Sequence, residues 1–219
     1  MRELAVQAFV TLDGVMQAPG GPEEDPSGGF SAGGWSVPYW DDVIEQSMGE
    51  AMGRPFDLVL GRKTYEIFAA HWPHAEGPGA EVLNDATKHV ASTTLTELEW
   101  ENSNLIEGDV AEGVGRLKEA DGPELQVHGS ANLIQTLLAN DLVDEVRVLI
   151  YPVVVGPGKR LFGDGTIPRA FELTGSKVSP SGVIIATFRR AGEVEVGSFA
   201  FDEPTEAEVE RHRGLAEGS

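Results

Sequence analysis

A group of glycine, cationic and hydroxyl residues at positions 61–64 has the composition of a phosphate site. An apolar run ends at Gly61, Arg62 and Lys63 follow at once, and Thr64 adds a hydroxyl group before a helical pattern begins. The first N–H groups of a helix lack an intrahelical partner and carry partial positive charge, so they bind anions. Two cations beside them favour a phosphate ligand, although a solvated basic turn would have the same sequence.

A second helical pattern opens on small and hydroxyl residues, namely Gly129, Ser130, Ala131 and Asn132. A glycine would let a pyrophosphate approach the backbone, and the serine can donate a hydrogen bond. An ordinary capped helix would read the same way. Ser92 and Thr93 offer hydroxyl groups for a further phosphate contact or for a turn. Each segment alone proves little, and their combination is what favours a nucleotide ligand.

Other catalytic motifs are absent or out of context. Gly-x-Ser-x-Gly occurs at 29–33, but the strand before it and the helix after it that a nucleophile elbow needs are missing. His71 and His74 have no neighbouring acid that would complete a metal site. Neither the phosphate-loop motif nor the Rossmann fingerprint occurs. We therefore expect no serine hydrolase, no metal site and no Rossmann domain.

The composition narrows the class of partner. The chain of 219 residues has 16 basic and 36 acidic side chains, a formal charge of −20, and no cysteine, which excludes disulfides and thiol catalysis. Such acidity repels phosphate backbones, so nucleic acid is not an expected partner and an anionic ligand needs a few local cations. The apolar runs are too short to cross a bilayer, and the first residues do not suit a secretory signal. We expect a cytoplasmic protein without a membrane partner.

Strand-like and helical patterns alternate through the body of the chain, which predicts an α/β fold. Asp41 can cap the first helix, and glycines and prolines make residues 17–38 a long, mobile loop that could act as a lid. The expected strands cover residues 4–12, 57–60, 89–91, 104–106, 124–128 and 146–151. The other expected helices cover residues 64–70, 110–117 and 133–138, the last capped by Ser130.

The end of the chain differs from its body. Residues 171–178 and 182–189 predict an antiparallel hairpin, which closes a mixed, mostly parallel central sheet flanked by helices. We take residues 1–190 as one domain and residues 191–219 as an acidic extension, in which residues 205–208 form a capping box. The alternating apolar residues Val194, Val196, Phe199 and Phe201 could add an edge strand or cover a partner subunit, or the extension could be a frayed tail.

Taken in this order, the segments resemble the dihydrofolate reductase-like fold, and especially the reductase domain of the bifunctional riboflavin-biosynthesis deaminase-reductase family. The resemblance covers about residues 2–190 and rests on residues 9–14, 60–66, 127–130 and 142–162, of which the sequence PVVVGPGKRLF at 152–162 is the most specific. It implies NADPH bound along the carboxyl ends of the sheet, and a homodimer. The zinc deaminase half of that family needs cysteine ligands, so only reduction is left.

The resemblance carries roles over to individual residues. Gly61, Arg62, Lys63 and Thr64 match the segment that holds the adenosine 2′-phosphate and the pyrophosphate. Ser92 and Thr93 match a second 2′-phosphate contact, and Gly129, Ser130, Ala131 and Asn132 match the pyrophosphate loop. Asp13 and Gly14 match the turn beside the nicotinamide, although an Asp-Gly pair after a strand is also an ordinary turn. Lys159 and Arg160 could receive a phosphate of the substrate or could be basic turn residues.

Dihydrofolate reductases place the proton-donating carboxylate shortly after a Trp-x-x-Pro segment. Here Trp35 opens that segment as a substrate-binding candidate, but the position expected for the acid holds Trp40. The nearest acid is Asp41, which the helix cap also claims. Asp41 and Asp13 are therefore the catalytic candidates.

The resemblance implies hydride transfer from C4 of NADPH to an electrophilic C=N or C=O carbon. The most concrete form is a 5-amino-6-(5-phosphoribosylamino)uracil reductase-like enzyme acting on a small heterocyclic or ribosylated substrate. A dihydrofolate, pteridine or xenobiotic reductase is the alternative enzyme. An alternative of another class is an NADP-binding protein without turnover that acts through a protein partner.

Overall fold

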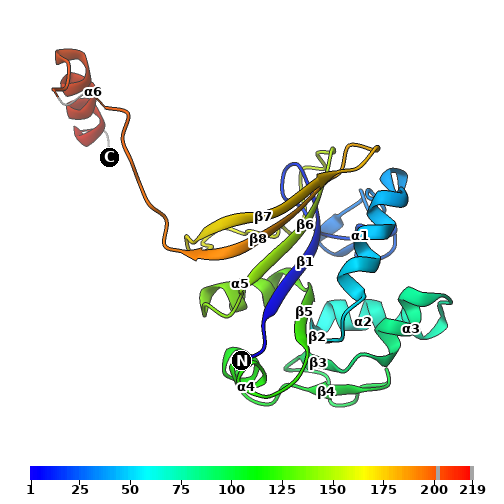
Figure 1. The fold of residues 1–219 in the computed structure, drawn as a ribbon. Helices are drawn as coiled ribbons and strands as arrows, with labels where there is room; N and C mark the ends of the chain where they lie inside the picture. Colours follow the sequence, from blue (N-terminus) through cyan, green and yellow to red (C-terminus); the bar gives the residue numbers. More distant parts are fainter. Residues whose placement is uncertain (201–202, 218–219) are drawn as a thin grey trace.

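The central strands are apolar on both faces, and helices cover both faces. In the computed structural model, which describes residues 1–200 and 203–217, eight strands form one sheet in the order β4-β3-β2-β5-β1-β6-β8-β7 (Figure 1). The strands are β1 Leu4–Thr11, β2 Phe56–Gly61, β3 Lys88–Ala91, β4 Ser103–Leu105, β5 Glu124–Gly129, β6 Glu145–Tyr151, β7 Ala170–Val178 and β8 Ile184–Gly192. The first six strands are parallel to one another, β8 is antiparallel to β6, and β7 is antiparallel to β8. The predicted mixed, mostly parallel α/β sheet with a closing hairpin is confirmed.

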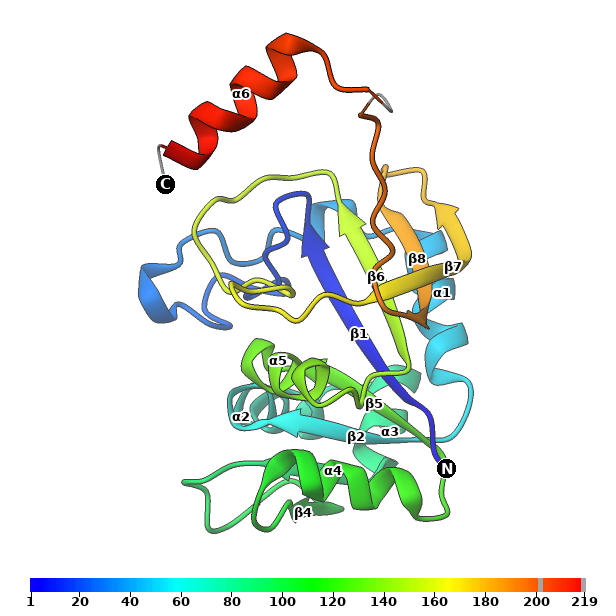
Figure 2. The same ribbon diagram turned by 90° about the vertical axis from the view of Figure 1, so that its left-hand side faces the viewer.

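Five of the described helices, α1 to α5, form one layer on each side of the sheet, and α6 stands apart from it. They are α1 Asp42–Met52, α2 Arg62–His71, α3 Pro78–Asp85, α4 Val110–Glu119, α5 Ala131–Ala139 and α6 Glu206–Glu217. Helices α4 and α5 pack on the side chains of Val6 and Val127, in front of the sheet in Figure 2. Helices α1 to α3 pack on the other face, where Ile44 and Leu83 are buried. Consecutive residues of β1 and β5 therefore point into different layers.

The segment after β1 is packed against the body. It contains two single 3-10 turns, η1 Ser27–Gly29 and η2 Val37–Tyr39. Between them Phe30 and Trp35 are buried in one cluster with Ile44 and Tyr151. The indole Nε1 of Trp35 donates to the carbonyl of Gln17 at 2.8 Å. The expectation of a mobile loop missed this packing, because it depends on contacts with residues more than a hundred positions away.

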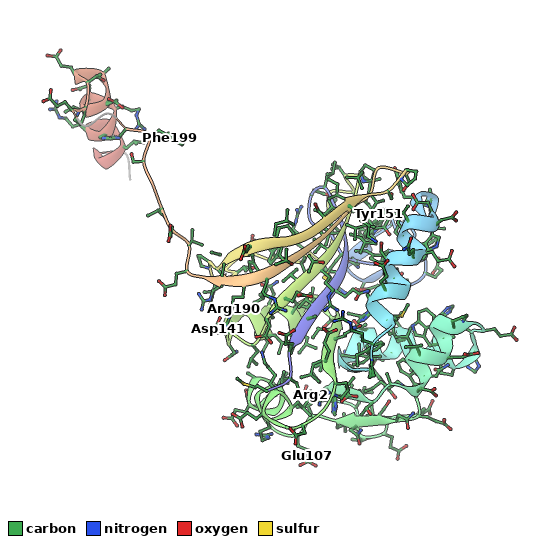
Figure 3. All side chains as sticks on the ribbon, in the orientation of Figure 1. Arg2, Glu107, Asp141, Tyr151, Arg190 and Phe199 are labelled. Carbon is green, nitrogen blue, oxygen red and sulfur yellow. The ribbon has the colours of Figure 1, made fainter. Side chains whose placement is uncertain are left out.

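Two local expectations need correction. Ser130 stands at the N-cap of α5, but its side chain makes no capping hydrogen bond. Residues 193–200 add no strand, and Phe199 is fully exposed on the segment that leads away from β8 (Figure 3). Figure 1 shows α6 apart from the sheet. Phe201 lies outside the described residues, and a cover for a partner subunit stays a prediction.

The capping box at the start of α6 is confirmed. The backbone N–H of Thr205 donates to Glu208 Oε2 at 2.9 Å, and Glu208 N–H donates to Thr205 Oγ1 at 3.3 Å. The start of α6 is thus fixed by the sequence itself. Among the described residues, no helix is long and apolar enough to cross a membrane.

The two edges of the sheet are short or irregular. Strand β4 has three residues. Strand β7 pairs with β8 alone, and its register shifts twice, between Ala170 and Phe171 and between Leu173 and Gly175. At the base of the hairpin, Arg190 forms an ion pair of 2.5 Å with Asp141, and the two are labelled side by side in Figure 3. The hairpin is thereby tied to the segment that precedes β6.

Candidate functional site

All six parallel strands end at the same edge of the sheet, so the segments that follow them meet there. Helix α2 begins directly after β2, and helix α5 begins one residue after β5. Strands β2 and β5 are neighbours. The two helix starts that the sequence suggested as phosphate sites therefore lie side by side.

Two glycines make this close approach possible. A Cβ atom on Gly61 would lie 2.9 Å from the backbone nitrogen of Ser130, and one on Gly129 would lie 2.5 Å from Thr64 Oγ1. Real Cβ atoms do not come this close to backbone or hydroxyl atoms. Gly129 also has φ +140°, which disfavours other residues. The starts of both helices thus adjoin one region, and helix starts are places where phosphates bind.

A cavity of about 210 Å³ adjoins the two helix starts. Sites for drug-sized ligands are typically about 300–1,000 Å³, so this cavity has room for a single ring with its substituents. The remainder of a dinucleotide would lie along the open strand ends. The polar residues that line the cavity are Gln7, Gln17, Glu24, Asp25, Lys63, Thr64, His128, Ser130, Asn132 and Lys159.

The floor of the cavity contains polar residues that the sequence analysis missed as site residues. Gln7 is only 4 % exposed, although it belongs to an apolar strand. Its Nε2 contacts Met48 Sδ at 3.4 Å, and its Oε1 is buried without a hydrogen-bond partner. His128 also lines the floor, and burial together with the charge of Arg147 lowers its pKa to about 4. The imidazole is therefore neutral at pH 7.

Glu24 is the acidic group whose environment favours a bound proton. Its Oε2 accepts from the backbone N–H groups of Gly20 and Gly21, at 2.6 and 3.1 Å. Burial nevertheless raises its pKa, and the neighbouring Asp25 adds to that effect. A half-buried carboxyl with a raised pKa at a cavity wall is suited to give a proton.

The predicted cations lie at the start of α2. Arg62 and Lys63 both pair with Glu66, at 2.9 and 3.2 Å, and both are about half exposed. Lys63 lines the cavity together with Thr64. Solvent screens such exposed pairs, so either cation can turn to a phosphate at low cost. The composition of this helix start fits a phosphate group.

The hydroxyl of Ser92 stabilises a turn. Its Oγ accepts from the N–H groups of Thr94 and Leu95, at 3.2 and 2.9 Å. Ser92 and Thr93 follow β3, next to the end of β2. They do not line the cavity, and a contact with an extended dinucleotide there stays a prediction.

The Asp13 carboxylate is fully engaged at the end of β1. It accepts from Thr11 Oγ1 at 2.6 Å and from the backbone N–H of Gly156 at 2.8 Å. The hydrogen bond from Thr11 is the largest effect that lowers its pKa, and that from Gly156 adds to it. Gly14 follows with φ +80° in a tight turn. Asp13 fastens the segment after β6 to the end of β1 and lies outside the cavity lining.

The Asp41 carboxylate caps α1. Its Oδ1 accepts from the N–H groups of Val43 and Ile44, and its Oδ2 accepts from Ser181 at 3.0 Å. Burial alone would raise its pKa, but hydrogen bonds from Ile44 and from Ser181 lower it to about 2. The carboxylate is ionised at neutral pH, and these hydrogen bonds come from α1 and from Ser181. They favour the role of helix cap over that of proton donor.

The three substrate-binding candidates occupy different places. Lys159 lines the cavity, where its Nζ pairs with Asp25 at 2.5 Å and bonds Ser27 Oγ at 2.8 Å. Arg160 donates to the carbonyls of Asp13 and Gly156 and is outside the lining. Trp35 is buried, and its ring packs edge to face on that of Tyr151 with 5.2 Å between the ring centroids. It does not line the cavity either. Of the three, only Lys159 reaches the cavity.

Of the polar groups at the site, none forms a metal cluster. Within residues 1–200 and 203–217, no group of three His, Cys, Asp or Glu side chains could hold a metal ion. The site thus combines glycine backbone, cations, neutral polar groups and the two carboxyl groups of Glu24 and Asp25.

A family model matches most of the chain. The family model described as the RibD C-terminal domain matches residues 2–185. The uncharacterised Bacillus subtilis protein YyaP is 29% identical over 193 residues, which cover 84% of this chain and 92% of the relative. The Bacillus subtilis protein YwjB, also uncharacterised, is 27% identical over 123 residues, or 55% of this chain and 66% of the relative.

Solved structures share the fold. A protein from Shewanella sp. PV-4 named for riboflavin biosynthesis superposes with a TM-score of 0.63 at 22% identity, covering 86% of this chain and 99% of its own. A pyrimidine reductase-like protein from Corynebacterium diphtheriae gives 0.58 at 14% identity, covering 88% and 93%. Dihydrofolate reductase from Enterococcus faecalis, complexed with NADP(H), gives 0.54 at 15% identity, covering 86% and 96%. At these identities the likeness establishes the dihydrofolate reductase-like fold.

Proposed function

We propose that this chain, which belongs to the RibD C-terminal domain family, is an NADPH-dependent reductase of a small heterocyclic or ribosylated substrate. The proposal rests on one observation: the starts of α2 and α5 lie in close contact beside a cavity with room for a single ring. Gly61 and Gly129 bring the starts of α2 and α5 together, and Arg62 and Lys63 add positive charge to a chain of net charge −20. An anionic dinucleotide is the ligand that such a place would hold.

The residues at the helix starts would hold the cofactor. The N–H groups of α5 and the Ser130 hydroxyl would bind the pyrophosphate, with Gly129, Ala131 and Asn132 leaving room for it. Arg62, Lys63 and Thr64 would bind the 2′-phosphate, in exchange for the contacts with Glu66. When bound, NADPH supplies a hydride from C4 of its nicotinamide ring.

The cavity would orient the acceptor and provide the proton. Glu24 lines the space for one ring, and burial raises the pKa of its carboxyl, so it would be the group that supplies the proton. Reduction of a C=N or C=O bond consumes one proton for each hydride. Lys159 would contact a phosphate on the substrate, as an aminopyrimidine ribosyl phosphate reductase requires. Asp13 and Asp41 would act as positioning residues, because their oxygens are already bonded to the protein.

The test is calorimetric titration of the protein with NADPH and with NADH. We expect NADPH to bind more tightly, and Arg62→Ala combined with Lys63→Ala to remove the preference at a cost of about 1.5 to 3 kcal/mol for each charge-assisted bond lost. Arg116→Ala is the matched control, because Arg116 forms the same i,i+4 pair with Glu112 on α4, away from the site. It should leave both affinities unchanged.

Each outcome has a definite meaning. If neither nucleotide binds, the proposal fails. If NADPH binds but is not oxidised by any acceptor in a panel of reducible heterocycles, the chain is an NADP-binding protein without turnover. Oxidation by a dihydropterin and by no ribosylated pyrimidine would favour the dihydrofolate reductase alternative.

A further inference from the structure

An apolar groove lies on the face of the sheet where α5 packs. Its nine lining residues are all Val, Ile, Leu, Phe or Gly, and they come from β1, β6, β7, β8 and the segments after β1 and β6. Val10 and Val148 belong to the core beneath it, and Phe171 and Phe188 pack against that core. The groove has a volume of about 290 Å³, and Phe162, which also lines it, is half exposed. An open apolar surface of this kind marks a site of interaction.

A second apolar surface follows β8. Residues 193–200, which we call the arm, lie beyond residue 185, where the match to the family domain ends, and they form neither helix nor strand. Val196 is 92% exposed, and Phe199 is fully exposed at the far end of the arm (Figure 3). Apolar side chains gain free energy when they leave water. The arm is therefore suited to cover an apolar surface.

The arm starts beside the groove of its own chain but leads away from it. Ala170 of β7 pairs with Gly192, the last residue of β8, so the groove residue Phe171 lies next to the start of the arm. Figure 2 shows the arm on the side of the sheet where α5 packs, and Figure 1 shows that it stands off the body. Its eight residues, when extended, reach about 26 Å, whereas the groove follows β6 from Val146 to Ile150, about 13 Å. The arm is thus long enough to cover such a groove.

The charges of the two surfaces are complementary. Arg169 and Arg190 stand at the base of the hairpin, and both pair with the one carboxylate of Asp141. These three side chains together carry a net positive charge. The arm begins with Glu193 and Glu195, which are both exposed. Opposite charges across an interface steer two surfaces together and fix their register.

We propose that two copies of this chain exchange arms, so that the arm of each lies in the groove of the other. Arm and groove are on the same side of the sheet, so one two-fold rotation can bring each arm to the groove of the other copy. Val196 and Phe199 then leave water, and the acidic arm meets the cationic base of the hairpin. The proposal goes beyond the homodimer that the resemblance implies, because the arm lies outside the family domain. It is independent of the proposed function.

The test is sedimentation equilibrium of the full chain over a range of concentrations. We expect a dimer, and we expect Val196→Ser combined with Phe199→Ser to raise its dissociation constant at least about tenfold. Phe162→Ser, in the groove, should have an effect of the same size. Val178→Ser is the matched control, because Val178 is 66% exposed on β7 but does not line the groove. It should leave the dissociation constant unchanged.

A mixing experiment tests the exchange itself. The double variant of the arm keeps an intact groove, and Phe162→Ser keeps an intact arm. A mixed dimer of these two proteins therefore retains one complete contact between arm and groove, whereas each variant paired with itself retains none. With one of the two proteins fluorescently labelled, we expect the mixed dimer to be several-fold tighter than either variant alone.

Each result supports or overturns the proposal. A monomer at every concentration overturns it, including the case in which the arm covers the groove of its own chain. A dimer that the double variant does not weaken is held by another surface and also overturns it. A mixed dimer no tighter than the variants alone would show that arms do not contact grooves. The substitutions in the arm lie outside the folded body, so a dimer lost through them cannot be attributed to unfolding.

Discussion

The two ends of the parallel strands use polar residues in opposite ways. At the amino ends, charges are closely paired: Arg2 with Asp57 and Lys118 with Asp144, each at 2.5 Å, and Arg147 with Glu124 at 2.7 Å. Around the cavity, Lys159 is paired with Asp25 at 2.5 Å, but Gln7 Oε1 lacks a hydrogen-bond partner, and Arg62 and Lys63 share one partly exposed glutamate. One end of the sheet holds the strands in register, and the other leaves groups available to a ligand.

The largest effect should come from breaking a pair at the amino ends. Asp144 accepts from the N–H of Leu4 and from Lys118, which is only 7 % exposed. Asp144→Asn leaves that ammonium without a counter-charge, so we expect a loss of about 2 to 3 kcal/mol in the free energy of unfolding, measured in urea. NADPH affinity should not change.

Asp141→Asn is the control for that experiment. Asp141 pairs with Arg190 and Arg169, but its side chain is 52% exposed. We expect a loss below about 1 kcal/mol, because solvent screens the pairs. Equal losses for the two variants would contradict the distinction between buried and exposed pairs in this region.

The next effect concerns the interlocked helix starts. Gly61→Ala would push the new methyl group into Ser130 and separate α2 from α5. We expect NADPH affinity to fall more than about tenfold, or about 1.4 kcal/mol. Gly115→Ala is the control, since a Cβ atom there meets nothing and alanine favours a helix by about 1 kcal/mol. An unchanged NADPH affinity in Gly61→Ala would contradict the view that the carboxyl ends of the strands are arranged to bind a ligand.

A smaller effect should follow from removing the glutamate that competes for the cations. Glu66→Gln frees Arg62 and Lys63, so NADPH should bind a few-fold more tightly at low salt, with the gain lost at high salt. Glu112→Gln removes the equivalent partner of Arg116 on α4 and should have no effect. A looser complex in Glu66→Gln would mean that Glu66 orients the cations.

The smallest effect is the pH dependence of stability, which should have opposite signs at Glu24 and Asp41. Burial raises the pKa of Glu24 above its usual 4.5, so the folded state holds the proton longer and stability falls as pH rises from that value. The pKa of Asp41 is lowered from 3.8 to about 2, so stability falls as pH drops through that interval. The free energy of unfolding, measured in urea between pH 2 and 8, should become less dependent on pH above about pH 4.5 in Glu24→Gln. In Asp41→Asn it should become less dependent on pH only below about pH 4. An unchanged pH dependence above about pH 4.5 in Glu24→Gln would contradict this assignment.

Local patterns were enough to predict most of the fold. The helix starts at Arg62 and Ala131 follow glycines that end apolar strands, and the predicted hairpin is present with bounds shifted by a few residues. These features depend on residues close in sequence, where turn and cap chemistry is readable. The choice of a dihydrofolate reductase-like topology needed the resemblance as well.

Sequence patterns did not identify two residues that line the cavity. Gln7 and His128 lie inside apolar strands, and only strand pairing makes them neighbours. Polar residues inside strands that are buried on both faces were the available indication. Glu24 could not be distinguished from Glu23 by sequence, because its raised pKa depends on how residues 20–24 fold. Asp41 suited both a cap and an acid, and the bond from Ser181, 140 positions away, was not foreseeable.

The short and irregular edges of the sheet have a consequence for behaviour at high concentration. A straight, unpaired edge invites another chain to add to it, which leads to aggregation. Strand β4 offers only three residues, and the two register shifts of β7 interrupt any continuous row of unpaired N–H and C=O groups. Salt that screens the charge of −20 would remove mutual repulsion but not this geometric protection. Association through the edges of the sheet should therefore stay disfavoured in concentrated salt, where charge no longer keeps the molecules apart.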